Sequence, residues 1–116
     1  MRFADFITSD TAILDEPDSF PDGASSCMMA AAVFRGILHG YVSSAYRDAA
    51  EAAFSAAAEK TDEMGLVHEV CGCPDFLSEG TSAEAQAALI MADAWRKKLE
   101  AAEASAGAGP ERQKAL

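Results

Sequence analysis

One stretch of the sequence, HEVCGCPDF at residues 68–76, combines side chains that can bind a metal ion. His68, Cys71 and Cys73 place an imidazole and two thiols within six positions. Both groups are good zinc ligands, so zinc is the cofactor that this stretch would bind. A structural zinc site usually takes four ligands in two pairs, and a second pair is missing here. The candidates for a fourth ligand are Cys27, His39 and Asp75.

The same two cysteines allow two other interpretations. Cys71 and Cys73 could close a small disulfide ring, which would be strained and easily reduced, as a thiol oxidoreductase or redox sensor requires. Alternatively, Gly72 and Pro74 form a turn in which both cysteines are small residues packed beside the core. The missing second ligand pair favours the turn, and the sequence leaves all three interpretations open.

No catalytic motif is found elsewhere in the chain. The phosphate-binding GxxxxGK, the GxSxG nucleophile turn and the HExxH zinc motif are all absent from the sequence. The carboxylates include no pair that is suited to acid–base work, and the serines have no evident base. A non-enzymatic protein without a cofactor is therefore the better-supported hypothesis.

The formal net charge of −10 is concentrated in one part of the chain. Residues 1–79 carry 14 acidic and four basic residues, whereas residues 80–116 carry five of each. Such a surface repels nucleic-acid phosphates and anionic membranes, so we expect neither direct nucleic-acid binding nor membrane binding. It can instead meet a protein partner with a basic surface. The alternative is that the acidic residues only keep an alanine-rich chain in solution.

These observations favour a protein–protein interaction module, such as an adaptor, an accessory subunit or an inhibitor, whose acidic surface could mimic nucleic acid. A thiol or zinc protein with its site at Cys71 and Cys73 is the competing hypothesis. We expect a cytoplasmic location, because the first residues lack a signal-peptide pattern and no charge-free apolar run is long enough to span a bilayer. The predicted partner-binding residues are Asp15, Glu16, Asp18, Asp22, Glu51, Glu59, Asp62 and Glu63.

Alanine accounts for 26 of the 116 residues and dominates the apolar part of the composition. It favours helix strongly but removes little apolar surface from water when it is buried. The chain therefore predicts a small core that depends on close helix–helix contact or on a partner. Self-association into a homo-oligomer is one way to cover an apolar face.

The apolar pattern predicts an all-α fold with an irregular connector over residues 64–80 and a C-terminal helix packed antiparallel to the first helical region. That first region, residues 24–63, is either one long helix or a broken one, because Gly36 and Gly40 permit close crossing but also interrupt helices. Steps of 100° place one apolar stripe on it. This stripe contains Cys27, Ala30, Phe34, Ile37, Leu38, Tyr41, Ala45, Ala49, Ala52 and Ala56.

Both helical regions have capping signals. Ser25 or Ser26 is suited to cap the first, and Thr81 with Glu84 forms a capping-box pattern before the last. The stripe of the last helix is Ala85, Ala88, Leu89, Ala92, Trp95, Leu99 and Ala102. The residues expected in the core or in an interface are Phe34, Ile37, Leu38, Tyr41, Leu89, Trp95 and Leu99.

The length of 116 residues suits one domain. We predict a single helical domain over residues 1–104, of which residues 1–26 form an N-terminal arm. Residues 105–116 are rich in small and polar residues and are predicted to form a flexible tail.

Overall fold

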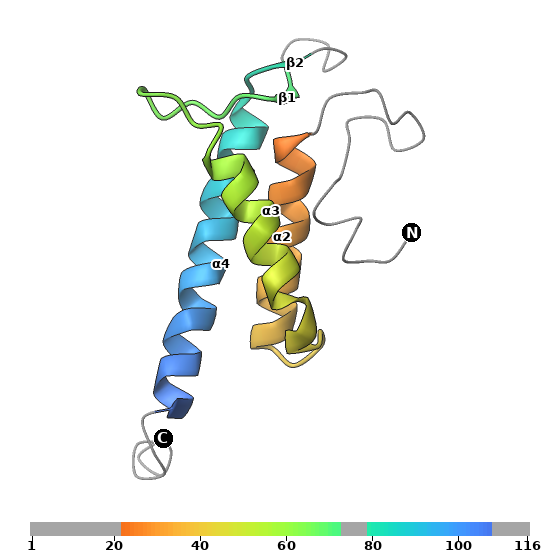
Figure 1. Cartoon of the computed structure of the whole chain (residues 1–116), viewed down its shortest axis with the longest axis vertical. Coiled ribbons are helices and arrows are strands. Elements are labelled where there is room, and N and C mark those ends of the chain that lie inside the picture. Colours follow the sequence, from red (N-terminus) through yellow and green to blue (C-terminus); the bar gives the residue numbers. More distant parts are fainter. Residues whose placement is uncertain (1–21, 73–78, 108–116) are drawn as a thin grey trace.

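The computed structural model describes residues 22–72 and 79–107, and these segments form three helices joined by short connections (Figure 1). With the numbering of Figure 1, the helices are α2 (Gly23–Leu38), α3 (Arg47–Ala58) and α4 (Ala83–Gly107). A single 3₁₀ turn, Ser44–Tyr46, leads into α3. The prediction of an all-α fold is therefore confirmed.

Helix α2 is the central element. Both other helices pack mainly on α2, and α4 makes the more extensive contact. Helix α3 runs antiparallel to α2 and α4, so α2 and α4 run in the same direction (Figure 1). The predicted antiparallel arrangement of the C-terminal helix holds for α3, whereas α4 is parallel to α2, the helix on which it mainly packs.

The break between α2 and α3 is a hydrogen-bonded turn. Gly40 has a φ of +79°, a conformation that a residue without Cβ adopts at little cost. Its N–H donates to the carbonyl of Ile37, and the N–H of Tyr41 donates to that of Gly36 at 2.7 Å. These two bonds form a Schellman motif, which ends a helix by using its free carbonyls. Of the two arrangements that the sequence allowed, the broken helix is the correct one.

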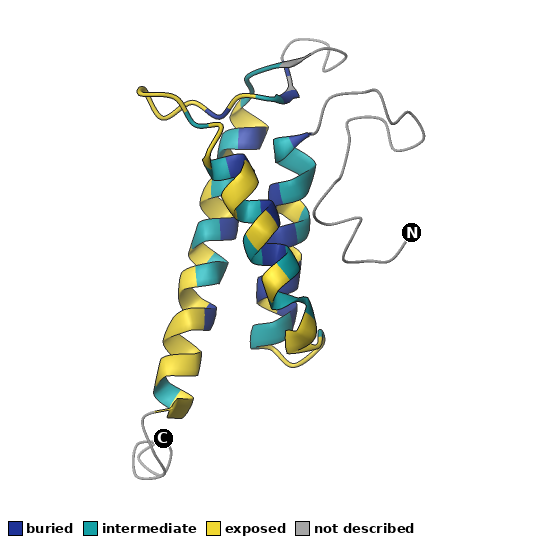
Figure 2. Cartoon of the chain, viewed as in Figure 1, coloured by how far each residue is buried: buried dark blue, intermediate teal, exposed yellow. Residues whose placement is uncertain are grey.

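The core consists largely of alanine packed between closely approaching helices. Eight of the fourteen buried apolar residues in the described segments are alanines, and Phe34 is the largest side chain that is fully buried. Figure 2 shows the buried residues along the lines where the helices face one another. Phe34 and Leu99 are buried as predicted, while Tyr41 is 87% exposed and does not lie in the core.

The break also changes which alanines of α3 are buried. The predicted stripe named Ala45, Ala49, Ala52 and Ala56, but the buried residues of α3 are Ala50, Ala53 and Ala57. That prediction was wrong because it continued the 100° steps through a turn that resets the helical phase. The stripe of α4 needs little correction: Ala85, Ala88, Ala92 and Leu99 are buried, and only Ala102 is exposed.

Both predicted caps were misplaced by a few residues. The side chain of Asp22 caps α2 by accepting from the N–H groups of Ala24 and Ser25, and the Ser25 hydroxyl donates to the same carboxylate. At α4, the hydroxyl of Ser82 accepts from the N–H of Ala85 at 3.1 Å, so Ser82 replaces Thr81 as the cap. In both cases a neighbouring polar residue of equal capping ability holds the position.

The connector between α3 and α4 is irregular except for short antiparallel pairings. Strand β1 (Val70–Cys71) pairs with β2 (Glu79–Gly80), and an isolated bridge joins Thr61 to Val67. The sequence offered β1 no evident partner, and this pairing was not predicted. Residues 1–21 of the predicted arm and residues 108–116 of the predicted tail lie outside the described residues. The rest of both segments includes the start of α2 at Gly23 and the end of α4 at Gly107.

Candidate interaction surface

The predicted zinc site at His68, Cys71 and Cys73 lies only partly within the described residues, so it stays a prediction. His68 is exposed, and its Nε2 lies 2.7 Å from a carboxylate oxygen of Asp62. Cys71 belongs to β1, whereas Cys73 and Asp75 lie outside the described residues. Within residues 22–72 and 79–107, no group of three histidine, cysteine or acidic side chains is arranged to hold a metal ion.

Cys27 and His39, the other candidate ligands, lie in the first turns and at the end of α2 respectively. Burial, reinforced by the negative charge of Asp22, raises the pKa of the Cys27 thiol to about 11. A thiol with this pKa stays protonated at neutral pH and is a poor nucleophile, and the side chain is only 1% exposed. Cys27 is therefore a small apolar residue of the core in this fold.

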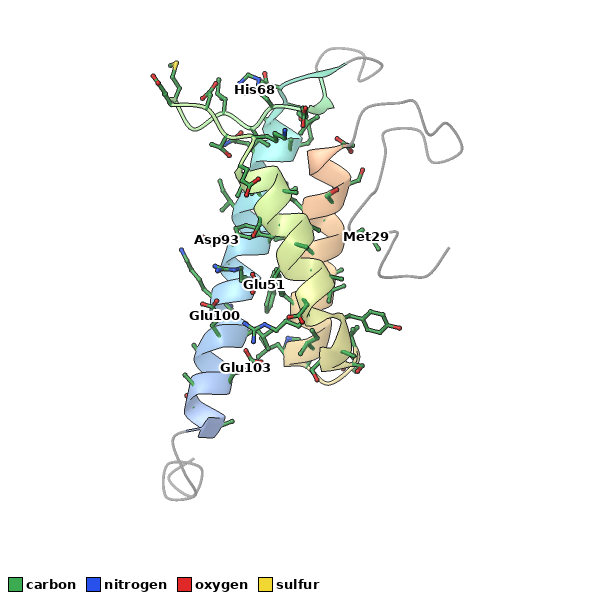
Figure 3. All side chains as sticks on the ribbon, viewed as in Figure 1. Met29, Glu51, His68, Asp93, Glu100 and Glu103 are labelled. Carbon is green, nitrogen blue, oxygen red and sulfur yellow. The ribbon has the colours of Figure 1, made fainter. Side chains whose placement is uncertain are left out.

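Two of the predicted partner-binding acids serve the fold instead. Asp22 is only 5% exposed and is the cap of α2. Glu51 forms ion pairs with Arg47, four residues before it, and with Arg96 of α4. Figure 3 shows Glu51 on the side of α3 that faces Glu100 and Glu103 of α4. The remaining predicted acids of the N-terminal segment, Asp15, Glu16 and Asp18, lie outside the described residues.

The other three predicted acids, Glu59, Asp62 and Glu63, lie together at the C-terminal end of α3. All three are exposed. They belong to residues 59–69, which the Thr61–Val67 bridge closes into a loop that projects from the bundle (Figure 1). We call residues 59–69 the acidic hairpin, since they contain four acids and one lysine.

Asp62 orders the tip of the acidic hairpin. One of its carboxylate oxygens accepts from the backbone N–H groups of Met64 and Leu66, at 2.9 and 3.0 Å. Its own N–H donates to the carbonyl of Leu66, and Gly65 donates back to the Asp62 carbonyl. The tip is thus a closed hydrogen-bonded turn, in which Gly65 takes a φ of +86°.

These bonds also affect the ionisation of Asp62. The hydrogen bond from His68, followed by that from the Leu66 N–H, lowers the pKa of the Asp62 carboxyl below its usual value. The charged form is the one that accepts these bonds, so the folded hairpin favours the carboxylate. Asp62 therefore stays negatively charged at neutral pH and well into the acidic range.

The acidic hairpin is hydrogen-bonded to α4 and to the start of α2. The side-chain oxygen of Gln86, in α4, accepts from the N–H of Val67 at 3.0 Å, and its nitrogen donates to the carbonyl of Gly65. The N–H of Gly23, at the start of α2, donates to the carbonyl of Glu69. Val67 and Val70 are buried between these contacts. The hairpin is therefore positioned relative to the bundle by contacts with two helices, α2 and α4.

Two large apolar side chains are exposed on this hairpin. Met64 is 87% exposed at the tip, and Leu66 is 42% exposed beside it. Glu63 is next to Met64 in the tip, and Glu59 lies at the C-terminal end of α3. Neither has an ion-pair partner among the described residues. The result is an ordered tip that exposes Met64 next to the Glu63 carboxylate.

The predicted partner-binding residues include three acids of this hairpin, whereas Met64 and the anchoring role of Gln86 were not predicted. The apolar alternation of MGLVHEV was the available signal for a strand-like hairpin. Gln86 gave no signal, because its contacts with Gly65 and Val67 span about twenty residues of sequence.

No protein-family model, no curated protein and no solved structure matches this chain. Among the described helices, none combines the length and the apolar character needed to cross a membrane. Any statement about function therefore depends on the surfaces described above.

Proposed function

We propose that this chain is a non-enzymatic interaction protein that presents the acidic hairpin to a protein partner with a basic surface. The observation that carries this proposal is the exposure of Met64 at the tip of an ordered turn. A Met side chain at this position contributes little to the core. Because the tip is already ordered, less conformational entropy is lost when a partner binds.

The chemistry of the tip indicates the kind of partner. A thioether is flexible and polarisable, so Met64 can fill an apolar pocket of irregular shape. Glu59 and Glu63 are free to meet arginine or lysine around such a pocket, because no cation of the described residues neutralises them. The partner that fits is a basic protein surface with an apolar depression at its centre.

Several roles agree with this surface, one broad and one narrower. A cytoplasmic adaptor, accessory subunit or inhibitor requires only the contact itself. Mimicry of nucleic acid is the narrower version, in which the partner's basic groove otherwise holds phosphates. Asp62 and Glu63 lie in the tip of the hairpin, so they would occupy one end of such a groove.

The test is crosslinking from the tip in the native host. A photoreactive amino acid replaces Met64, and a matched control carries it at Ala101, an exposed position of α4. We expect a basic protein to be crosslinked from position 64 and not from position 101. A tip that crosslinks to no protein, or the same products from both positions, would contradict the proposal.

A further inference from the structure

The ion pairs of the described residues leave two cations without an acidic partner. The chain carries 19 acids and nine lysine or arginine residues, so partners are abundant. Arg47, Lys60, Arg96 and Lys97 each form an ion pair with a carboxylate. Arg35 and Lys98 form none within residues 22–72 and 79–107.

Arg35 and Lys98 both lie against Trp95. The guanidinium carbon of Arg35 is 5.1 Å from the centre of the Trp95 ring, and the Lys98 Nζ is 4.8 Å from it. Both distances are within the range of cation–π contacts. The His39 ring meets Trp95 edge-on at 5.9 Å and lies 6.5 Å from the ring of Tyr41. We call these five residues the basic–aromatic patch.

The patch borders an open cleft. Arg35, His39 and Tyr41 line a cavity of about 560 Å³, together with Ala32, Gly36 and Val42, and no acidic side chain is among its lining residues. The Schellman turn holds the backbone of Tyr41, although its ring is 87% exposed. The cleft thus combines one cation, Arg35, with the exposed ring of Tyr41.

The patch and the acidic hairpin lie at opposite ends of α2. Arg35 and His39 are at the C-terminal end of this helix, and the hairpin is bonded to its first residue, Gly23. Sixteen residues of α-helix separate the two ends by about 24 Å. One molecule therefore presents an acidic tip at one end and a basic cleft at the other.

We infer that the basic–aromatic patch receives the acidic hairpin of a second copy of this chain, so that copies associate end to end. This inference shares the acidic hairpin with the proposed function and makes self-association a competitor for the basic partner. The fit is one of charge and surface type. The Arg35 guanidinium can bind the Glu63 or Glu59 carboxylate in a fork geometry, and Met64 can enter the cleft beside Tyr41.

The symmetry of the contact follows from its two different faces. Each copy contributes its tip to one neighbour and its cleft to another, so the interface is heterologous. Such a contact forms a chain of copies or a closed ring, and the average mass grows with protein concentration. The measurement is made near 0.15 M salt, where the Debye length is about 8 Å. Salt then screens the repulsion between the net charges of two molecules but weakens direct ion pairs much less.

Charge exchange at the two faces provides the test. Sedimentation velocity measures the average mass from about 1 μM to about 1 mM protein. The wild type is expected to associate, whereas Arg35→Glu/Lys98→Glu and Glu59→Lys/Glu63→Lys are each expected to stay monomeric. An equimolar mixture of these two variants regains association, because each reversed face meets the reversed face of the other. The control Asp48→Lys/Glu84→Lys has the same charge change as the hairpin variant and associates like the wild type.

A monomeric wild type at the highest concentration would overturn the inference, and so would a mixture that stays monomeric. Circular dichroism establishes that each variant retains its helices. The Arg35→Glu/Lys98→Glu variant also separates the two proposals, since its acidic hairpin is unchanged. If it still crosslinks a basic protein from position 64 while the wild type never associates, only this inference fails. If the wild type associates but nothing basic crosslinks, only the proposed function fails.

Discussion

Gly36 lets the turn after α2 fold back onto the helix. A Cβ at this position would clash with the side chain of Val42, which packs directly over it. We predict that Gly36→Ala destabilises the fold by about 1–3 kcal/mol, the usual cost of overpacking a close contact. Urea denaturation followed by circular dichroism measures the change. Gly107→Ala is the control, because a Cβ at Gly107 meets open space. If both variants had an equally lowered free energy of unfolding, this account would be contradicted.

Cys27 shows how burial controls the chemistry of a thiol. With a pKa of about 11, it is expected to have roughly a thousandth of its thiols ionised at pH 8. In a Cys71→Ser/Cys73→Ser background, iodoacetamide should therefore modify Cys27 only when urea unfolds the chain. Mass spectrometry of the alkylated protein checks this. Rapid modification of the folded protein would show that Cys27 is accessible and ionised, against the structure.

At the scale of the element, Asp62 makes the order of the acidic hairpin depend on pH. Its pKa is below the usual 3.8 in the folded hairpin, so the stability that its carboxylate contributes is fully present above pH 3.8. This stability is lost as the pH falls through the lowered value. We predict that the NMR amide signals of Met64 and Leu66 show an acid transition whose midpoint lies below 3.8.

The variant Asp62→Asn provides the control for this titration. Its side-chain oxygen can still accept from the two amides, but it carries no charge that a proton could remove. The acid transition of Met64 and Leu66 should therefore disappear. A wild-type midpoint at or above the usual aspartate pKa would mean that the bonds to Asp62 are absent in solution.

The elements also show which parts of the structure local sequence patterns can predict. The helices, the alanine stripe of α4 and the irregular connector follow from periodicity and from Gly and Pro positions, which act over a few residues. The phase of α3 was mispredicted because the positive φ of Gly40 rotates everything after it. Three acids of the hairpin, Glu59, Asp62 and Glu63, were predicted to bind a partner, and that stays a prediction. The position of the hairpin depends on Gln86, whose contacts are remote in sequence.

At the scale of the whole molecule, the distribution of small and charged residues agrees with an interaction protein. Alanines allow α3 and α4 to approach α2 closely, and this leaves little large apolar area to stabilise the bundle. Ion pairs across the α3–α4 side, including Glu51 with Arg96, use several of the available cations (Figure 3). The exposed hairpin acids Glu59 and Glu63 lie at one end of α2, and Arg35, which has no ion pair among the described residues, lies at the other.

The most direct measurement is the quantity of partner that the purified chain retains from an extract of its native host. We compare the wild type with Glu59→Gln/Glu63→Gln/Met64→Ala and with the matched control Asp48→Asn/Glu84→Gln/Met91→Ala, which removes two exposed acids and one exposed methionine elsewhere. Quantitative mass spectrometry should find a basic protein that the wild type and the control retain equally. The hairpin variant should retain at least about tenfold less of it, which corresponds to a loss of roughly 1.4 kcal/mol of binding free energy. Equal retention by all three proteins would contradict the claim that the acidic hairpin is the contact surface.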